Sequence, residues 1–567
     1  MAVYYAVVVM IWLSRKSSLV LPLLLSLCSA GASQSYNAWA AGHISNLSSQ
    51  RGTTNDPDGD GDVNLVEFAF GTDPLAPGGI SGAVTPVFGS RSGTNGTFTV
   101  ELLEKDGHPP GAQIDLWLSD NLTDWFRPWW LRTTTNSQPS DPPGSARESF
   151  STRLPGTSFW FVRSSVSLIE AGPETAAYYV ATNGSDSDSG TSPVQPFATL
   201  SKAASLANPG NLIYLRGGTY HFTAQASLSR SGNPSQPIRV RAYPGESPTL
   251  DFTGEPSGSA GIQITGSWWQ LYGLEIVHAG HNGIKITGHS NLVERCVVHE
   301  SGDTGIHITA ASAPALPASY NLILNCDSYR NYDPPIGGNA DGFSAKFVLG
   351  VGNEFRGCRG WNNSDDGWDL WQATNCVVIE NCITWSNGFN VFDANPATNT
   401  SFNGNGNGFK LGGNYYFGPH RIAHSISFGN KVNGYDQNNN NAGMIVDHNT
   451  AWANGSRNFS LNHGTNITPH VIRNNLSFAG VVADSFRAGS LLTNNSWQVV
   501  SPAATAADVL STTVSLITGP RRDDGGIPET PFLRPVPTGR LVNRGVNIGE
   551  LFIGAAPDLG AYETPEW

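Results

Sequence analysis

Four short segments of the sequence share a pattern in which a Gly is followed by alternating apolar and polar residues, at 341–346, 366–371, 387–392 and 407–412. In a strand, this alternation turns the residue after the Gly inward and the next residue outward. The residues predicted to point inward are Phe343, Trp368, Phe389 and Phe409. Those predicted to point outward are Ser344, Asp369, Asn390 and Lys410. The outward face therefore gathers carboxylates and a lysine, which could bind a cation and move a proton.

The carboxylates are expected to form one metal site. Asp341 and Asp366 precede the Gly in neighbouring repeats, so they should lie roughly one strand spacing, about 5 Å, apart. Asp365 and Asp369 belong to the same turn and strand as Asp366. Four carboxylates this close repel one another unless a cation lies between them, and hard oxygen ligands select calcium or magnesium. We predict calcium; the alternative is a solvated acidic turn, because Asp-Asp-Gly is also an ordinary turn sequence.

Lys410 is the predicted catalytic base. The pattern places it two repeats beyond Asp369 in the same outward column, roughly 10 Å along the surface. It could remove a proton from a sugar whose carboxylate the metal holds. Calcium and Lys431 would lower its pKa, so alkaline pH should favour activity. Lys346 is the alternative base. The residues predicted to contact the substrate are Lys346, Lys431, Asn390 and Asp436.

From Tyr178 onward the sequence is an array of repeats of roughly 20 to 26 residues, which predicts an all-β, right-handed parallel β-helix over 178–567. Three sets of residues recur at matching positions. The Asn set, expected to form a hydrogen-bonded ladder, is Asn331, Asn363, Asn387, Asn430 and Asn454. The aromatic set is His299, Tyr329, Trp361, Trp385, Phe428, Trp452 and Phe478. The thiols expected to stack without disulfides are Cys296, Cys326, Cys358 and Cys382. The segment from about residue 504 is expected to cover the open core.

The composition fits a turn-rich β protein, because 64 of the 567 residues are Gly and only 14 % are charged. The formal net charge of −13 argues against nucleic acid as a partner.

Residues 1–32 predict an export signal, with Arg15 and Lys16 before an apolar run and a small-residue cleavage site at 30–32. A membrane anchor and lipidation of Cys28 are the alternatives. We expect a secreted, periplasmic or cell-surface monomer with no transmembrane segment after cleavage.

Two further regions precede the repeats. Residues 33–78 contain oxygen-bearing side chains at the spacing of an EF-hand loop, which predicts a structural calcium site, with an acidic linker as the alternative. Its predicted ligands are Asp56, Asp58, Asp60, Asp62, Asn64 and Glu67. Residues 84–170 contain short alternating runs between Gly and Pro turns, which predict a small β-sandwich.

Several segments resemble the pectate lyases of polysaccharide lyase family 9, over about residues 178–500. They are 339–346, 352–370, 407–413 and 434–438, with 178–186 and 215–220 similar to the family's first coil. The resemblance implies a calcium-dependent lyase acting on an acidic polysaccharide such as polygalacturonate. It assigns Lys410 as the base and, as calcium ligands, Asp341, Asp365, Asp366 and Asp369. The Gly- and Asn-rich segment 393–405 departs from the pattern and could reshape the substrate groove.

Two other functions remain open from the sequence. A glycoside hydrolase on the same fold, such as a polygalacturonase, would use the clustered carboxylates as acid and base. Lys410 would then have no role. A non-catalytic carbohydrate-binding protein would use the same site for binding alone.

Overall fold

The structure is a computed structural model that describes residues 176–310, 317–462, 468–522, 525–550, 552 and 554–564, together with the backbone of six strands between residues 84 and 168. The chain divides into two compact units. The larger unit comprises residues 175–551 and 556–564.

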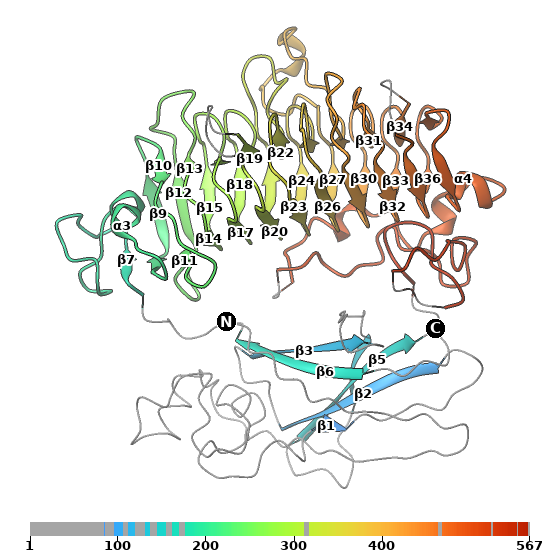
Figure 1. The fold of residues 1–567 in the computed structure, drawn as a ribbon, viewed down its shortest axis with the longest axis horizontal. Coiled ribbons are helices and arrows are strands. Elements are labelled where there is room, and N and C mark those ends of the chain that lie inside the picture. The colour runs from blue at the N-terminus through green and yellow to red at the C-terminus, as the bar shows by residue number, and fades with distance from the viewer. Residues whose placement is uncertain are drawn as a thin grey trace. The chain divides into compact units, whose positions relative to one another are not determined.

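The larger unit is a β-helix of three parallel sheets whose strands stack coil upon coil along one axis (Figure 1). The twelve-stranded sheet consists of β7 (Tyr178–Val180), β8 (Leu212–Leu215), β11 (Ile238–Ala242), β14 (Trp269–Tyr272), β17 (Leu292–Glu294), β20 (Leu322–Leu324), β23 (Asn353–Arg356), β26 (Val377–Glu380), β29 (Arg421–Ala423), β32 (Ile445–Asp447), β35 (Val471–Arg473) and β38 (Leu491–Thr493). The second, here the ladder sheet, consists of β9 (Gly218–His221), β12 (Pro248–Asp251), β15 (Glu275–Val277), β18 (Val297–His299), β21 (Asp327–Tyr329), β24 (Arg359–Trp361), β27 (Ile383–Trp385), β30 (Ile426–Phe428), β33 (Thr450–Trp452) and β36 (Leu476–Phe478). The third, here the site sheet, consists of β10 (Ala226–Leu228), β13 (Ile262–Ile264), β16 (Ile284–Ile286), β19 (Ile306–Thr309), β22 (Phe343–Lys346), β25 (Trp368–Asp369), β28 (Phe409–Lys410), β31 (Tyr435–Asp436), β34 (Phe459–Leu461) and β37 (Ser485–Phe486). The predicted right-handed parallel β-helix is confirmed.

From β22 onward, the core beneath the site sheet is a stack of aromatic rings, one from each coil, whereas β13, β16 and β19 place Ile there. Phe343 stacks on Trp368 with ring centroids 4.4 Å apart, and Phe409 follows at 5.0 Å and Tyr435 at 5.1 Å. All four side chains are fully buried. The register of the strands repeats the alternation of the sequence, so the residues beside these rings face outward. The stacking of these rings fixes the position of each outward residue along the axis of the β-helix.

The predicted Asn ladder is confirmed. Each Asn after Asn331 accepts, at Oδ1, hydrogen bonds from the backbone and side-chain nitrogens of its counterpart in the preceding coil. The side-chain links run from Asn331 to Asn363 at 2.8 Å, on to Asn387 at 3.0 Å and on to Asn430 at 2.8 Å. The ladder satisfies buried backbone groups where the chain turns between sheets. It is therefore structural.

The aromatic set also forms a ladder, on the outer face of the ladder sheet. Its rings stack from His299 to Trp385 with centroids 4.5–4.8 Å apart. The C-terminal segment packs against this face, where Phe532 contacts Phe428 at 5.0 Å. The prediction that this segment covers the open core was wrong. The segment instead removes the apolar rings of the outer aromatic ladder from water, which is favourable. Among the described residues, α4 (Ser496–Val499) instead packs Trp497 against the last coils of the core.

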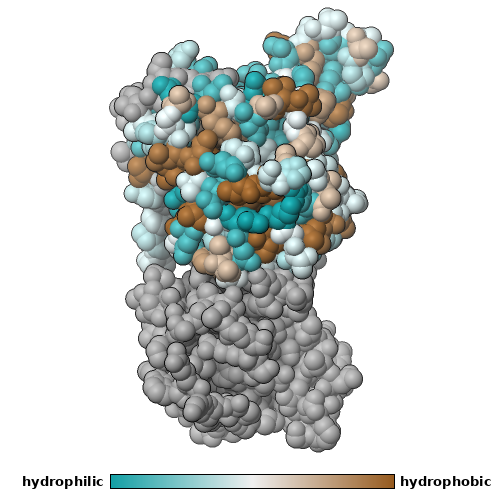
Figure 2. Space-filling view, turned by 90° about the vertical axis from the view of Figure 1, so that its right-hand side faces the viewer, coloured by the Kyte–Doolittle hydropathy of each residue, from teal (hydrophilic) through white to brown (hydrophobic). Residues whose placement is uncertain are grey.

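Other elements of this unit are α3 (Leu200–Leu206) and the short helices η2 (Pro396–Thr398), η3 (Ala506–Asp508) and η4 (Val514–Leu516). Viewed along the axis from the last coils, the surface mixes hydrophobic and hydrophilic residues (Figure 2). The four stacked cysteines are buried and unbridged, as predicted. Their thiols approach backbone carbonyl oxygens, for example Cys326 Sγ at 3.4 Å from the oxygen of Val293.

The smaller unit contains antiparallel strands. One sheet has the order β1 (Val84–Thr85), β2 (Gly96–Lys105), β5 (Ser145–Leu154) and β4 (Leu131–Thr135), and a second pairs β3 (Ala112–Ser119) with β6 (Phe161–Leu168). Two antiparallel sheets are what a small β-sandwich requires. The predicted export signal and EF-hand-like loop lie outside the described residues and stay predictions.

A second buried column lies before the strands of the twelve-stranded sheet. It contains Asn in earlier coils and His in some later coils. Asn291 accepts the backbone N–H of Trp269 at 2.9 Å, and His420 Nδ1 accepts that of Val377 at 3.2 Å. Burial lowers the pKa of His420 from 6.5 to about 3. The unfolded chain therefore binds a proton more readily than the folded chain below about pH 6.5.

We expect this histidine to weaken the protein in acid. Its contribution is fully present above about pH 6.5 and is lost as the pH falls toward about 3, with a loss of about 2 kcal/mol by pH 5. His420→Asn keeps an acceptor but removes the titration. The fall in melting temperature between pH 7 and pH 5 should thus be smaller in His420→Asn than in the unmodified protein. An equal fall in both proteins would contradict this assignment.

Candidate active site

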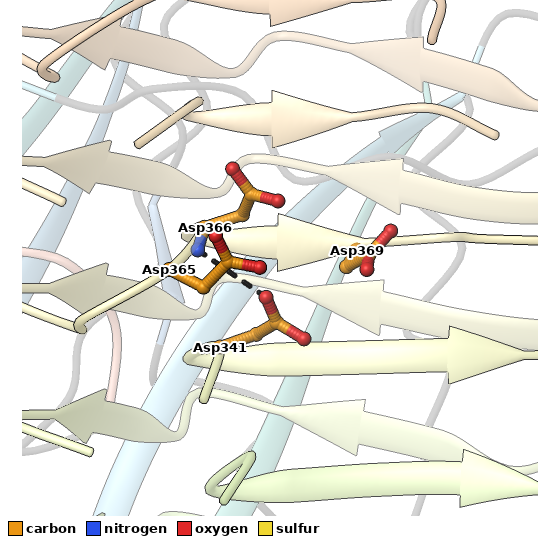
Figure 3. Close-up of side chains that lie close together, drawn as sticks. All are labelled: Asp341, Asp365, Asp366 and Asp369. Atoms are coloured by element: carbon orange, nitrogen blue, oxygen red, sulfur yellow. Dashed lines mark hydrogen bonds between the residues drawn. The ribbon is translucent and has the colours of Figure 1, made fainter. Parts of the chain in front are cut away.

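Four buried aspartates meet on the outward face of the site sheet. Asp341 ends the turn before β22, Asp365 and Asp366 end the turn before β25, and Asp369 lies within β25 (Figure 3). One carboxylate oxygen from each lies within 4.8 Å of those of the other three. The backbone N–H of Asp366 donates to Asp341 Oδ1 at 3.2 Å, which ties the two turns together. The predicted clustering of these four residues is what the structure shows.

Two lysines, from the strands on either side of β25, lie against the carboxylates. Lys346 Nζ is 2.8 Å from both Asp341 Oδ2 and Asp369 Oδ2. Lys410 Nζ is 3.0 Å from Asp366 Oδ2 and 3.3 Å from Asp369 Oδ2. Burial opposes the charge on both ammonium groups, but the carboxylates outweigh it and raise the pKa of each lysine. Without a metal, both lysines are therefore protonated.

When ionised, the four carboxylates carry more negative charge than the two lysines neutralise. Burial raises the pKa of Asp341 well above its usual range and that of Asp365 to about 7, and nearby carboxylates add to both shifts. The pKa of Asp366 is raised for the same reasons, whereas the two lysines outweigh burial at Asp369 and lower its pKa. If all four carboxylates were ionised, the two ammonium groups would leave two negative charges uncompensated, and the raised pKa values of Asp341, Asp365 and Asp366 reflect this excess. A hard divalent cation fits this all-oxygen donor set and this charge.

The structure corrects the predicted position of Lys410. The strand β28 pairs directly with β25, so Lys410 is the register partner of Asp369 one coil away. The segment 387–392 is not a strand of the site sheet. Asn387 instead belongs to the Asn ladder, and Phe389, predicted to point inward, is 43 % exposed. The predicted base and the predicted metal ligands are therefore in contact, where a gap of roughly 10 Å was expected.

The reason is a loop inserted within one coil, at 388–406. It carries the short helix η2 and rises above the stack of coils in Figure 1. Phe392 of the loop stacks on Tyr332 with centroids 4.5 Å apart. At the far end of the loop, the backbone N–H of Asn405 donates to Asp365 Oδ1 at 2.5 Å. The loop is thus part of the wall around the carboxylates.

The other predicted contact residues fall in different places. Lys346 and Asp436 lie on the site sheet, with Asp436 the register partner of Lys410. Asn390 lies in the inserted loop and donates to Asp393 Oδ2 at 2.8 Å. Lys431 Nζ donates to the backbone oxygen of Gly404 at 2.9 Å. The structure therefore places Asp436 in register with Lys410, and Lys346 against the same Asp369 carboxylate as Lys410, whereas in the described part of the chain Asn390 contacts neither lysine.

Two residues that hold the carboxylates were not predicted. Thr304 Oγ1 donates to Asp341 Oδ2 at 3.0 Å, and Asn407 Nδ2 donates to Asp366 Oδ1 at 3.0 Å. Both precede a Gly in the same way as the aspartates. Aligning 304–309 with the other Gly-containing segments would have found the column Thr304, Asp341, Asp366 and Asn407.

Comparisons with known proteins agree with this geometry. Residues 178–475 match the family model described as Pel9A-like, right handed beta helix region. Pectate lyase L of Dickeya chrysanthemi is 40 % identical over 402 residues, covering 68 % of this chain and 90 % of that protein. The crystal structure of pectate lyase Pel9A covers 68 % of this chain and 96 % of that one, with 38 % identity and a TM-score of 0.61. A rhamnogalacturonan lyase structure matches with 27 % identity, a TM-score of 0.55, and coverage of 63 % of this chain and 96 % of that one.

The fold, the site and these relatives define the class of protein, which is a polysaccharide lyase built on a right-handed parallel β-helix. Within that class, the chain belongs to the Pel9A-like family, the pectate lyases of polysaccharide lyase family 9. The resemblance seen in the sequence is confirmed. In the part of the chain that the structure describes, no helix combines the length and apolar character needed to cross a membrane.

Proposed function

We propose that the protein is a calcium-dependent lyase that cleaves (1,4)-linked polygalacturonate by β-elimination and releases 4,5-unsaturated oligogalacturonides. The observation that carries the proposal is the contact between Lys410 and the four buried aspartates on one outward face. Calcium held by Asp341, Asp365, Asp366 and Asp369 would neutralise the substrate's uronate group and acidify the hydrogen at C5.

Lys410 is the proposed base. Its amine takes the C5 proton, the electron pair left behind forms the C4–C5 double bond, and the C4–O bond breaks. The departing oxygen receives a proton from solvent. Lys346 is the less suitable base, since its two carboxylate contacts, both at 2.8 Å, are shorter than those of Lys410 at 3.0 and 3.3 Å. We assign Lys346 to holding those carboxylates in place.

Lys410 must lose its proton before it can act as a base. Its pKa is raised because the surrounding carboxylates outweigh its burial. Once those carboxylates are neutralised, burial is the remaining influence and lowers the pKa. The rate should therefore rise with pH in the alkaline range.

We propose that the enzyme works outside the cytoplasm, as a secreted, periplasmic or surface protein. The support is the sequence of residues 1–32, which has the features of an export signal. The EF-hand-like loop at 56–67 suits a calcium-rich exterior. The acidic polymer is the proposed partner, and the monomeric state remains a prediction.

The test follows unsaturated products on a panel of polymers. Polygalacturonate, methylesterified pectin, rhamnogalacturonan and alginate are each incubated with the enzyme in calcium or in chelator. We expect near-ultraviolet absorbance to rise on polygalacturonate in calcium only. Saturated reducing ends without this absorbance would indicate a hydrolase instead. Polymer binding without any product would indicate a non-catalytic carbohydrate-binding protein.

A further inference from the structure

A straight column of polar side chains runs along the site sheet and passes through the active site. The strands pair without any slip in register, so each coil contributes one outward residue about 4.8 Å from the next. In chain order the members up to the base are Ser227, Gln263, Lys285, His307, Ser344, Asp369 and Lys410. A polymer lying along the coils at the active site would follow this column.

Lys285 is distinct from the other lysines of the column and the site. Lys346 and Lys410 are each held by carboxylates. Lys285 is partly exposed, and among the residues that the structure describes no hydrogen bond or ion pair to its side chain is present. It lies three strand spacings from Asp369, roughly 14 Å. Its charge is therefore available to a ligand that extends beyond the carboxylate cluster.

His307 lies between Lys285 and the cluster. Its Nδ1 is 2.6 Å from Ser344 Oγ, which fixes the ring, and the side chain is nearly buried. Burial, aided by the charges of Lys346 and Lys285, holds its pKa well below the usual value. The imidazole is therefore neutral, and Nε2 has no hydrogen-bond partner among the described residues. It can contact a sugar without adding charge.

The column differs on the other side of Lys410. Its next members are Asp436 and Ser460, neither of which can attract an anion by charge. Lys431 and Arg457 on that side belong to the turns before β31 and β34 rather than to the column. The charge along the column thus favours extension of an anionic chain toward the N-terminal coils.

We propose that Lys285 and His307 form a subsite that binds a uronate residue of the polymer remote from the cleaved bond, with Lys285 pairing with its carboxylate. The inference rests on the proposed function, because it takes a uronate polymer as the ligand. It assigns a direction to the bound chain, toward the first coils of the helix.

The test compares Lys285→Gln with Arg544→Gln. Each variant removes one positive charge, and Arg544 lies on the exposed C-terminal segment away from the site sheet. For polygalacturonate at low salt, we expect KM to rise about 3- to 5-fold in Lys285→Gln and not in Arg544→Gln. The rise should be smaller for short oligogalacturonides and for assays in high salt, where exposed charges are screened. Lys285→Glu should raise KM further.

An unchanged KM for the polymer in both Lys285 variants would overturn the subsite. Retention in gels that contain polygalacturonate provides a second measurement that needs no turnover. If the unmodified protein forms no unsaturated product, the proposed function fails. The subsite then stands or falls on whether Lys285→Gln is retained less than Arg544→Gln.

Discussion

Replacing Lys410 with Ala should reduce the turnover of polygalacturonate by about 10³-fold, because a positioned general base contributes 10²–10⁴-fold to such a reaction. The side chain is buried and lies 3.0–3.3 Å from two of the proposed calcium ligands. No other described lysine except Lys346 contacts this cluster. The measurement is the initial rate of unsaturated product formation at saturating polymer and calcium.

The same variant should still bind calcium. Lys410 and a divalent cation are attracted to the same carboxylates, so removing the ammonium should leave calcium affinity equal or higher. The calcium-induced rise in melting temperature should therefore persist in Lys410→Ala. This separates loss of the base from loss of the metal site.

Lys346→Ala is the matched control, because both lysines are buried against the same carboxylates. We expect it to disturb the positions of the Asp341 and Asp369 carboxylates that Lys346 holds, and to lose less activity at saturating calcium than Lys410→Ala. Full activity in Lys410→Ala together with a dead Lys346→Ala would transfer the role of base to Lys346. Full activity in both would contradict proton abstraction by a lysine.

The repeat and the outward column could be predicted from the sequence because both are local. Alternation after each Gly sets which side chain faces out, and the ring stack from Phe343 to Tyr435 shows that the pattern also fills the core. The Asn ladder follows equally well, since each Asn meets its counterpart one coil away.

The distance from Asp369 to Lys410 could not be predicted in the same way. The segment starting at Asn387 has the sequence of a strand of the site sheet, but its Asn is taken by the ladder. The next strand of the site sheet therefore begins only at Phe409, after the inserted loop. Which strands pair across a loop of this length depends on tertiary packing. Sequence spacing alone does not distinguish the loop from a further coil.

Removing calcium should abolish activity and lower the stability of the protein. A variant of one of the four aspartates tests whether they bind this calcium, because it should raise the melting temperature in chelator and reduce the stabilisation by calcium. Calcium at about 100 times its dissociation constant should stabilise the protein by about 2.7 kcal/mol for one site. The EF-hand-like loop could contribute a second effect. The informative quantity is therefore the difference between the unmodified protein and a variant of the buried cluster.

Asp365→Asn is the most suitable variant. Its Oδ1 accepts the backbone N–H of Asn405, a bond that an Asn can keep. The change removes one charge from a group of buried carboxylates that burial and mutual repulsion already disfavour. In chelator at pH 8, Asp365→Asn should therefore melt at a higher temperature than the unmodified protein. In calcium it should gain less stability and lose most of its activity, because a charged ligand is missing.

The control is Asp447→Asn, at a buried carboxylate of the twelve-stranded sheet that pairs with Arg473 at 2.6 Å. Here the charge is compensated, so the change should lower the melting temperature in chelator and in calcium alike. Calcium should stabilise this variant as much as the unmodified protein. If Asp365→Asn behaved like Asp447→Asn, the four aspartates would not be the calcium site. The opposite signs in chelator therefore distinguish a site with uncompensated negative charge from an ordinary buried ion pair.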